Sequence, residues 1–228
     1  MLKSKELRAK AWESLRGKYW KAFFVTLVLG ILISIGTSCV SFSQELVNVV
    51  TMVPAEEMDS TMAVGALVVY GIALVSVVIG FLISLLVGNA AQVGLCNYFI
   101  KNTDSTPDFK DGFSGFKVKY GRNIGTLLLV GVKGFLWTCL FIIPGIIKMY
   151  EYAIIPYILA DDAEISCSDA FKKAKQMMKG NKWRLFKLEF SFIGWFLLCC
   201  LTCGIGVFFL EPYYSAAMAE FYVELKNN

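Results

Sequence analysis

The chain alternates between long apolar stretches and shorter polar segments rich in charged residues. An α-helix rises about 1.5 Å per residue, so roughly 20 consecutive apolar residues cross the ~30 Å hydrocarbon core of a bilayer. The pattern therefore predicts an all-α membrane protein whose single integral membrane domain takes in residues 1–228. The predicted membrane-spanning helices are Ala22–Phe42, Met62–Val87, Ile124–Ile143, Ile146–Ala160, Leu185–Cys203 and Ile205–Val223.

Two of the breaks between these helices are very short. Pro144 and Gly145 separate the third helix from the fourth, and Gly204 separates the fifth from the sixth. Proline and glycine interrupt helices and permit tight reversals. We therefore predict that the six transmembrane helices form three hairpins.

A polar segment with a helical pattern precedes each predicted hairpin, at residues 4–16, 109–120 and 168–179. In the last of these, Ser168 is the predicted N-cap and Gly180 the C-terminal stop. Its apolar residues recur at spacings of three and four, with lysines between them, as in an amphipathic helix lying in the membrane interface. These apolar residues are Ala170, Phe171, Ala174, Met177 and Met178.

Basic and acidic residues are distributed unequally among the polar segments. Lys and Arg gather before the first span, between the second and third, and between the fourth and fifth, whereas the loop Ser43–Thr61 has only acidic charges, Glu45, Glu56, Glu57 and Asp59. Basic loops are retained on the cytoplasmic side. We therefore expect a multi-pass protein of the bacterial plasma membrane with both termini in the cytoplasm, facing anionic lipid. A basic surface that binds nucleic acid is the alternative, but no binding motif accompanies these segments.

Composition narrows the chemistry further. Hydrophobic residues make up 57% of the 228 positions, and no histidine is present, which removes the commonest general base and metal ligand. Among the seven cysteines, Cys200 and Cys203 have the C-x-x-C spacing of redox and metal motifs, but no second pair accompanies them. We therefore predict no catalytic residues, no metal and no cofactor, and assign the cysteines to packing.

Charged residues inside predicted spans are costly and often functional. Lys133 falls in the middle of the third span, and Glu151 and Glu211 fall in the outer halves of the fourth and sixth. Lys133 is therefore predicted to meet Glu151 or Glu211. The cluster has two interpretations, an ion pair that holds hairpins together or a binding site for an ion, a proton or a polar substrate.

Several motifs in the second half of the chain resemble the DUF975 family of bacterial integral membrane proteins. The resemblance rests on Tyr152–Asp162, Ser168–Phe171, Met177–Phe186, Phe192–Trp195 and Pro212-Tyr213. It implies a multi-span membrane protein of uncharacterised function. The organisation is also distantly similar to the membrane domain of some glycerophosphodiester phosphodiesterases, whose catalytic domain has no counterpart in this sequence.

The sequence favours a non-enzymatic membrane protein that organises lipid or supports a membrane protein partner through its basic interfacial helices. The alternative is a small transporter or channel that uses Lys133, Glu151 and Glu211, and an enzyme acting on lipid is a third class. The residues predicted to contact lipid or a partner are Trp20, Lys172, Lys175, Lys179, Trp183 and Arg184.

Overall fold

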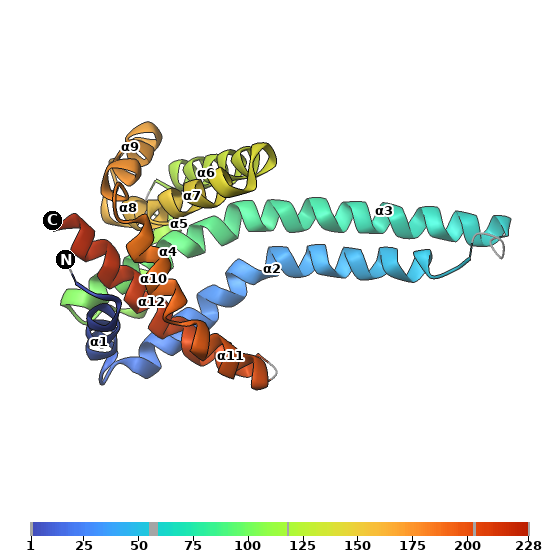
Figure 1. The fold of residues 1–228 in the computed structure, drawn as a ribbon. Coiled ribbons are helices and arrows are strands. Elements are labelled where there is room, and N and C mark those ends of the chain that lie inside the picture. The colour runs from blue at the N-terminus through green and yellow to red at the C-terminus, as the bar shows by residue number, and fades with distance from the viewer. Residues whose placement is uncertain (1, 55–58, 118, 203, 228) are drawn as a thin grey trace. The chain divides into compact units, whose positions relative to one another are not determined.

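The computed structural model describes residues 2–54, 59–117, 119–202 and 204–227, and all regular structure within these ranges is helical. Part of the predicted acidic loop, Glu56 and Glu57, and the second cysteine of the C-x-x-C motif, Cys203, lie outside the described residues. The helices are α1 (Ser4–Leu15), α2 (Tyr19–Thr51), α3 (Ser60–Ile83), the π-helix η2 (Ser84–Gly88), α4 (Asn89–Asp104), the 3₁₀ helix η3 (Phe109–Phe113), α5 (Ser114–Lys117), α6 (Tyr120–Leu140), α7 (Ile142–Tyr152), α8 (Ile155–Asp161), α9 (Cys167–Met177), α10 (Lys182–Phe190), α11 (Ile193–Leu201) and α12 (Ile205–Lys226) (Figure 1).

Four helical segments of the described chain are long and apolar enough to cross a membrane. They are Tyr19–Thr51, Ser60–Asp104, Tyr120–Leu140 and Ile142–Asp161. These segments contain the first, second and fourth predicted spans entirely, and the third, Ile124–Ile143, as far as Leu140. The last two predicted spans are not long and apolar enough to meet the same criterion. The fifth is divided at Ser191–Phe192 into the short helices α10 and α11, and the sixth, within α12, carries Glu211 and Glu220. The protein is therefore a helical membrane protein with four candidate spans.

The chain folds as two compact units. The smaller unit, Gly30–Asn89, consists of the facing parts of α2 and α3 together with η2. Gly36 and Gly80 bring these helices into close contact, since a Cβ atom on Gly36 would lie 2.6 Å from the carbonyl oxygen of Gly80. The Ser76 hydroxyl also donates a 3.0 Å hydrogen bond to the carbonyl of Cys39. Small residues at such crossings allow helix backbones to approach within the bilayer.

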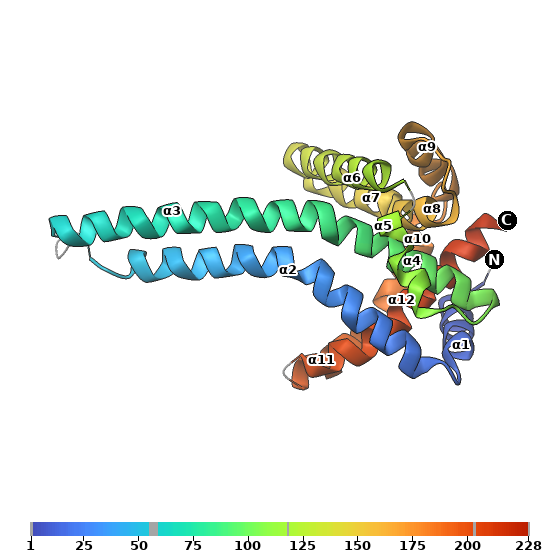
Figure 2. The ribbon, with the colours of Figure 1, turned by 180° about the vertical axis from the view of Figure 1, so that it is seen from behind.

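The larger unit, Met1–Leu29 with Ala90–Asn228, contains the buried core. Its largest fully buried side chains include Tyr98, Phe99, Phe192, Phe221 and Tyr222. Two helical hairpins belong to this unit, α6 with α7 and α11 with α12, and in both views the helices of each pair lie alongside one another (Figures 1 and 2). Helix α1 lies against α12, and α9 lies against α7 and α8.

The reversal between α6 and α7 differs from the prediction. The break is at Phe141, which is extended with φ −153° and ψ 127°, whereas Pro144 and Gly145 belong to the first turns of α7. Proline is compatible with a first helical turn, where its missing N–H has no intrahelical partner. Gly145 instead permits close packing, because a Cβ atom there would lie 2.7 Å from the Cα atom of Thr138.

The three predicted interfacial helices have different outcomes. The first and third are helices, α1 and α9, but α9 begins one residue earlier than predicted and its N-cap is Ser166, not Ser168. The second, residues 109–120, is divided into the short helices η3 and α5. Asp108 and Asp111 form a capping box that favours the 3₁₀ turn at this point.

Each of these segments is followed by a residue in the left-handed conformation. Gly17 has φ 77°, Gly180 has φ 81°, and Lys119 occupies the corresponding place in the second segment with φ 45°. A helix begins within three residues of each of them, α2, α10 and α6 respectively. The three segments therefore share this backbone geometry, with a lysine where the other two have glycine.

Candidate functional site

The charged residues predicted to form an intramembrane cluster have separate partners. Lys133 on α6 places its Nζ atom 3.8 Å from the ring centroid of Phe171 on α9. The Glu151 carboxylate instead pairs with Lys148 at 3.0 Å and with Lys182 at 2.6 Å. Within the described chain no ion pair joins Lys133 to Glu151 or Glu211. The predicted pairing is not formed. Helix α10 places Lys182 beside the buried Glu151 carboxylate, and Lys133 lies over Phe171 instead.

Glu151 is only 4% exposed, and its two lysine partners keep partial contact with solvent. A buried carboxylate is tolerated when cations and hydrogen bonds compensate its lost hydration. Lys148 comes from the same helix one turn earlier, and Lys182 from the first residue of α10. The contact therefore joins α7 to α10, and sequence spacing gave no signal for it.

Glu189 and Glu211 lie in a second polar region lined by tyrosines. The hydroxyls of Tyr150 and Tyr214 donate to Glu189 at 2.7 Å and 3.3 Å. The Ser215 hydroxyl donates to Glu211 at 3.5 Å, one turn along α12. These contacts connect α7, α10 and α12. They explain the presence of these polar side chains by hydrogen bonding within and between the helices.

Arg122 has a structural role that sequence reasoning missed. Its Nη1 atom donates to the carbonyls of Asp162, Ala163 and Ile165 at 3.2, 2.6 and 3.1 Å. These carbonyls follow the C-terminus of α8, where the helix dipole is negative and carbonyls lack intrahelical partners. The guanidinium thus fixes the loop between α8 and α9 to the start of α6.

The exposed lysines of α9, and Lys179 just after it, point away from the core. Ala170 and Ala174 are buried, whereas Lys172, Lys175 and Lys179 are exposed. Lys172 forms a 3.0 Å ion pair with Asp169. A hydrogen bond from the Ser166 hydroxyl, together with this lysine, holds the pKa of Asp169 below its ordinary value. The side of α9 away from the core is therefore predominantly basic.

The aromatic and arginine residues predicted to contact lipid fall into two groups. Trp20 and Trp183 are 64% and 62% exposed, and Trp183 stacks on Phe186 with 4.9 Å between ring centroids. The Arg184 side chain is instead engaged within the protein, because it forms an ion pair with Glu224 at 2.8 Å and donates to the carbonyl of Leu2 at 3.0 Å. Arg184 therefore joins the two ends of the chain.

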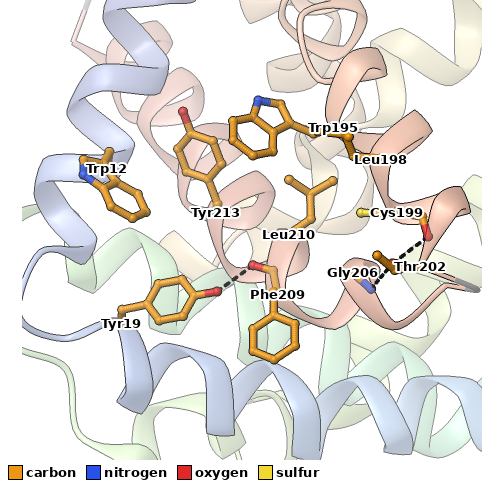
Figure 3. A pocket seen from close by; sticks show the side chains of 10 residues that line it. All are labelled: Trp12, Tyr19, Trp195, Leu198, Cys199, Thr202, Gly206, Phe209, Leu210 and Tyr213. Atoms are coloured by element: carbon orange, nitrogen blue, oxygen red, sulfur yellow. Dashed lines mark hydrogen bonds between the residues drawn. The ribbon is translucent and has the colours of Figure 1, made fainter.

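One concave feature of the larger unit is an aromatic pocket of about 520 Å³. It lies between α1, the first residue of α2 and the α11–α12 hairpin. Figure 3 shows the side chains that surround it, which are Trp12, Tyr19, Trp195, Leu198, Cys199, Thr202, Gly206, Phe209, Leu210 and Tyr213. The Trp12 and Tyr213 rings pack edge to face, with centroids 6.0 Å apart. Sequence reasoning did not identify this pocket, because its residues come from both ends of the chain.

The hydroxyl groups of the aromatic pocket already have partners within the protein. The Tyr19 hydroxyl donates to the carbonyl of Phe209 at 2.7 Å, and the Tyr213 hydroxyl donates to the carbonyl of Arg8 at 3.3 Å. Thr202 donates to the carbonyl of Cys199 and accepts from the N–H of Gly206. The lining that remains is apolar, so the pocket suits a hydrocarbon chain rather than a polar substrate.

The described cysteines give no sign of a metal or redox centre. Cys199 is buried and Cys200 is exposed. Among the residues that the structure describes, no group of three or more His, Cys, Asp or Glu side chains is arranged to hold a metal ion.

Together, the all-helical fold, its four candidate spans and the apolar pocket define a helical membrane protein. Residues 140–228 match the model of DUF975, a family described as protein of unknown function, and this match supports the assignment to that family made from the motifs of the same region. A search of curated proteins and a search of solved structures found no match. The similarity to glycerophosphodiester phosphodiesterases is not among the matches and carries no further argument.

Proposed function

We propose that this protein is a non-enzymatic component of the bacterial plasma membrane that binds and organises anionic lipid. The observation that carries the proposal is the aromatic pocket, whose lining is predominantly apolar once its hydroxyl groups have bonded within the protein, and which lies next to the charged helix α1. An acyl chain would occupy the pocket, and its headgroup would lie at the end of α1.

Arg16 supports the anionic character of this lipid. It is exposed at the C-cap of α1 and follows Trp12 by four residues, so both side chains fall on one side of the helix. A guanidinium can contact a phosphate through two parallel hydrogen bonds. The basic side of α9 would add a less specific attraction to the same membrane surface, with each cation near an anionic leaflet contributing about 1 kcal/mol. This proposal includes cytoplasmic termini, as the basic segments indicate.

The transporter alternative has less support. It required Lys133 to face Glu151 or Glu211, but Lys133 lies over Phe171 and Glu151 is neutralised by two other lysines. The hydroxyl groups that line the pocket are engaged within the protein, which does not favour a polar substrate.

Native mass spectrometry of the purified protein can test the proposal, after exchange into mixed phosphatidylglycerol and phosphatidylcholine. We expect the unmodified protein to retain phosphatidylglycerol preferentially. Trp12→Ala should lower the retained fraction at least threefold, and Arg16→Gln should reduce the preference for phosphatidylglycerol over phosphatidylcholine.

Control variants come from residues outside the pocket. Trp183→Ala removes an exposed tryptophan from α10, and Lys179→Gln removes an exposed cation from the segment between α9 and α10. Both controls should retain lipid like the unmodified protein. Equal losses in all four variants, or none in Trp12→Ala, would contradict a lipid site in the aromatic pocket.

A further inference from the structure

The side-by-side packing of α1 and α12 limits how much of α12 can enter a membrane. The N–H of Leu2 donates to Glu224 at 2.7 Å, near the C-terminal end of α12. At the other end of α1, the Trp12 ring packs against Tyr213. Helix α1 therefore accompanies α12 along its length from Glu224 back to Tyr213.

The outer side of α1 is charged. Its buried residues are Leu7, Ala11 and Leu15, whereas its exposed residues include Lys5, Glu6, Lys10 and Glu13. Charged side chains are strongly disfavoured in the hydrocarbon core of a bilayer. Helix α1, and with it the part of α12 from Tyr213 onward, must therefore lie in water or among lipid headgroups.

The part of α12 that remains is too short to cross a bilayer. It comprises eight residues, from 205 to 212, and extends about 12 Å at 1.5 Å per residue. Helix α11 has nine residues and a length of about 13 Å. The hydrocarbon core is roughly 30 Å thick, more than twice either length.

Helix α10 does not extend the hairpin. It carries Lys182, Arg184, Lys187 and Glu189, and Arg184 pairs with Glu224 beside the start of α1. The carbonyl of Ser191, between α10 and α11, accepts a 3.0 Å hydrogen bond from Arg8 of α1. Both arms of the hairpin therefore begin at the level of α1.

The end of the α11–α12 hairpin is apolar and exposed. Leu201, Ile205 and Phe208 are 82%, 62% and 55% exposed, and Leu197 is also exposed. No charged residue lies between Glu189 and Glu211 in the sequence. Such an end belongs in hydrocarbon, since it has nothing to anchor it in a headgroup layer or in water.

The backbone of the turn is suited to that environment. Irregular backbone facing lipid is normally excluded from the bilayer core because its N–H groups find no water. The described N–H groups of this turn all donate hydrogen bonds within the turn, at 3.0–3.2 Å. The N–H groups of Thr202 and Gly204 donate to the carbonyl of Cys199, and that of Ile205 donates to the carbonyl of Thr202. The N–H of Gly206 donates to the Thr202 hydroxyl, and that of Val207 donates to the carbonyl of Gly204. Gly204, with φ 86°, permits this compact reversal.

We propose that α11 and α12 form a re-entrant hairpin, which inserts into the leaflet next to α1, reverses within the hydrocarbon and returns to the same side. The hairpin contacts the acyl chains of that leaflet alone. Two predicted spans are thereby replaced by one membrane insertion that never reaches the opposite surface.

Site-directed spin labelling of the full-length protein in lipid nanodiscs tests the proposal, with the native cysteines replaced by alanine or serine. Labels at Leu201→Cys, Met52→Cys and Lys5→Cys report the hairpin end, the end of α2 and the exposed side of α1. At Leu201 we expect high collision rates with oxygen and rates with a water-soluble nickel complex at least fivefold below those at Lys5 and Met52. Nickel accessibility at Leu201 equal to that at Met52 would overturn the proposal.

A second variant avoids the cysteine background. Leu201→Lys places a charge at the hairpin end, and Met52→Lys places one at a similarly exposed residue, 80% against 82%. For a re-entrant hairpin, Leu201→Lys should lower the yield of folded protein severalfold while Met52→Lys leaves it unchanged. Equal tolerance of both charges would mean that the hairpin end reaches water or headgroups, which contradicts the proposal.

Discussion

The Oε2 atom of Glu151 lies 2.6 Å from the Nζ atom of Lys182, although 31 residues separate them in the chain. This contact joins the α6–α7 hairpin to α10 and neutralises a carboxylate that would otherwise be buried and uncompensated. It also explains why Glu151 is not paired with Lys133.

Replacing the carboxylate of Glu151 should destabilise the protein strongly. Removing one partner of a fully buried pair costs roughly 3–5 kcal/mol, and we expect about 2–3 kcal/mol for Glu151→Gln because Lys148 and Lys182 keep some contact with water. Thermal unfolding in detergent, followed by circular dichroism, measures the effect. Asp169→Asn removes a carboxylate from an exposed pair with Lys172 and should leave the midpoint unchanged; an equal loss in both variants would refute the special role of the buried pair.

Lys133 should be coupled to Phe171 and not to Glu151. A cation over an aromatic ring contributes about 0.5–2 kcal/mol, depending on its exposure to water. A double-mutant cycle with Lys133→Met and Phe171→Leu should therefore give a coupling energy in this range, measured by thermal unfolding. The parallel cycle with Lys133→Met and Glu151→Gln should give a coupling near zero. The reverse ranking would restore the charged cluster expected from the sequence.

A single methyl group should disturb the crossing of α2 and α3. In Gly36→Ala the new Cβ atom would meet the Gly80 carbonyl and Ser84, so the helices must separate. Overpacking of this kind costs about 1–3 kcal/mol. Gly71→Ala is the control on α3, because nothing lies within 4 Å of its Cβ position, and it should be neutral or stabilising. Thermal unfolding of both variants checks whether the two effects have opposite sign.

The left-handed residues before α6 and α10 should respond oppositely to substitution. Side chains disfavour the left-handed region by about 1–2 kcal/mol, so Gly180→Ala should destabilise the protein by about that amount. Lys119→Gly should remove the same strain and raise the unfolding midpoint. Gly125→Ala in α6, which has open space and ordinary helical φ, serves as the control. A rise in stability for Gly180→Ala would contradict the assigned geometry.

Local patterns in the sequence predicted the features that depend on neighbouring residues. Apolar length identified the four candidate spans, and the three-and-four spacing around Ala170 and Ala174 identified the helix α9. Glycine marked the left-handed positions 17 and 180. These signals work because helix periodicity, hydrocarbon thickness and backbone sterics act within a few turns of chain.

Only the tertiary structure decided which distant residues meet. It paired Glu151 with Lys182, set Lys133 over Phe171, and brought Trp12 to Tyr213 to close the aromatic pocket. It also placed the charged helix α1 beside α12. The sequence by itself determined that this is a helical membrane protein. Its pocket and ion pairs required the fold, because they depend on which helix faces pack together, and composition and spacing do not specify that.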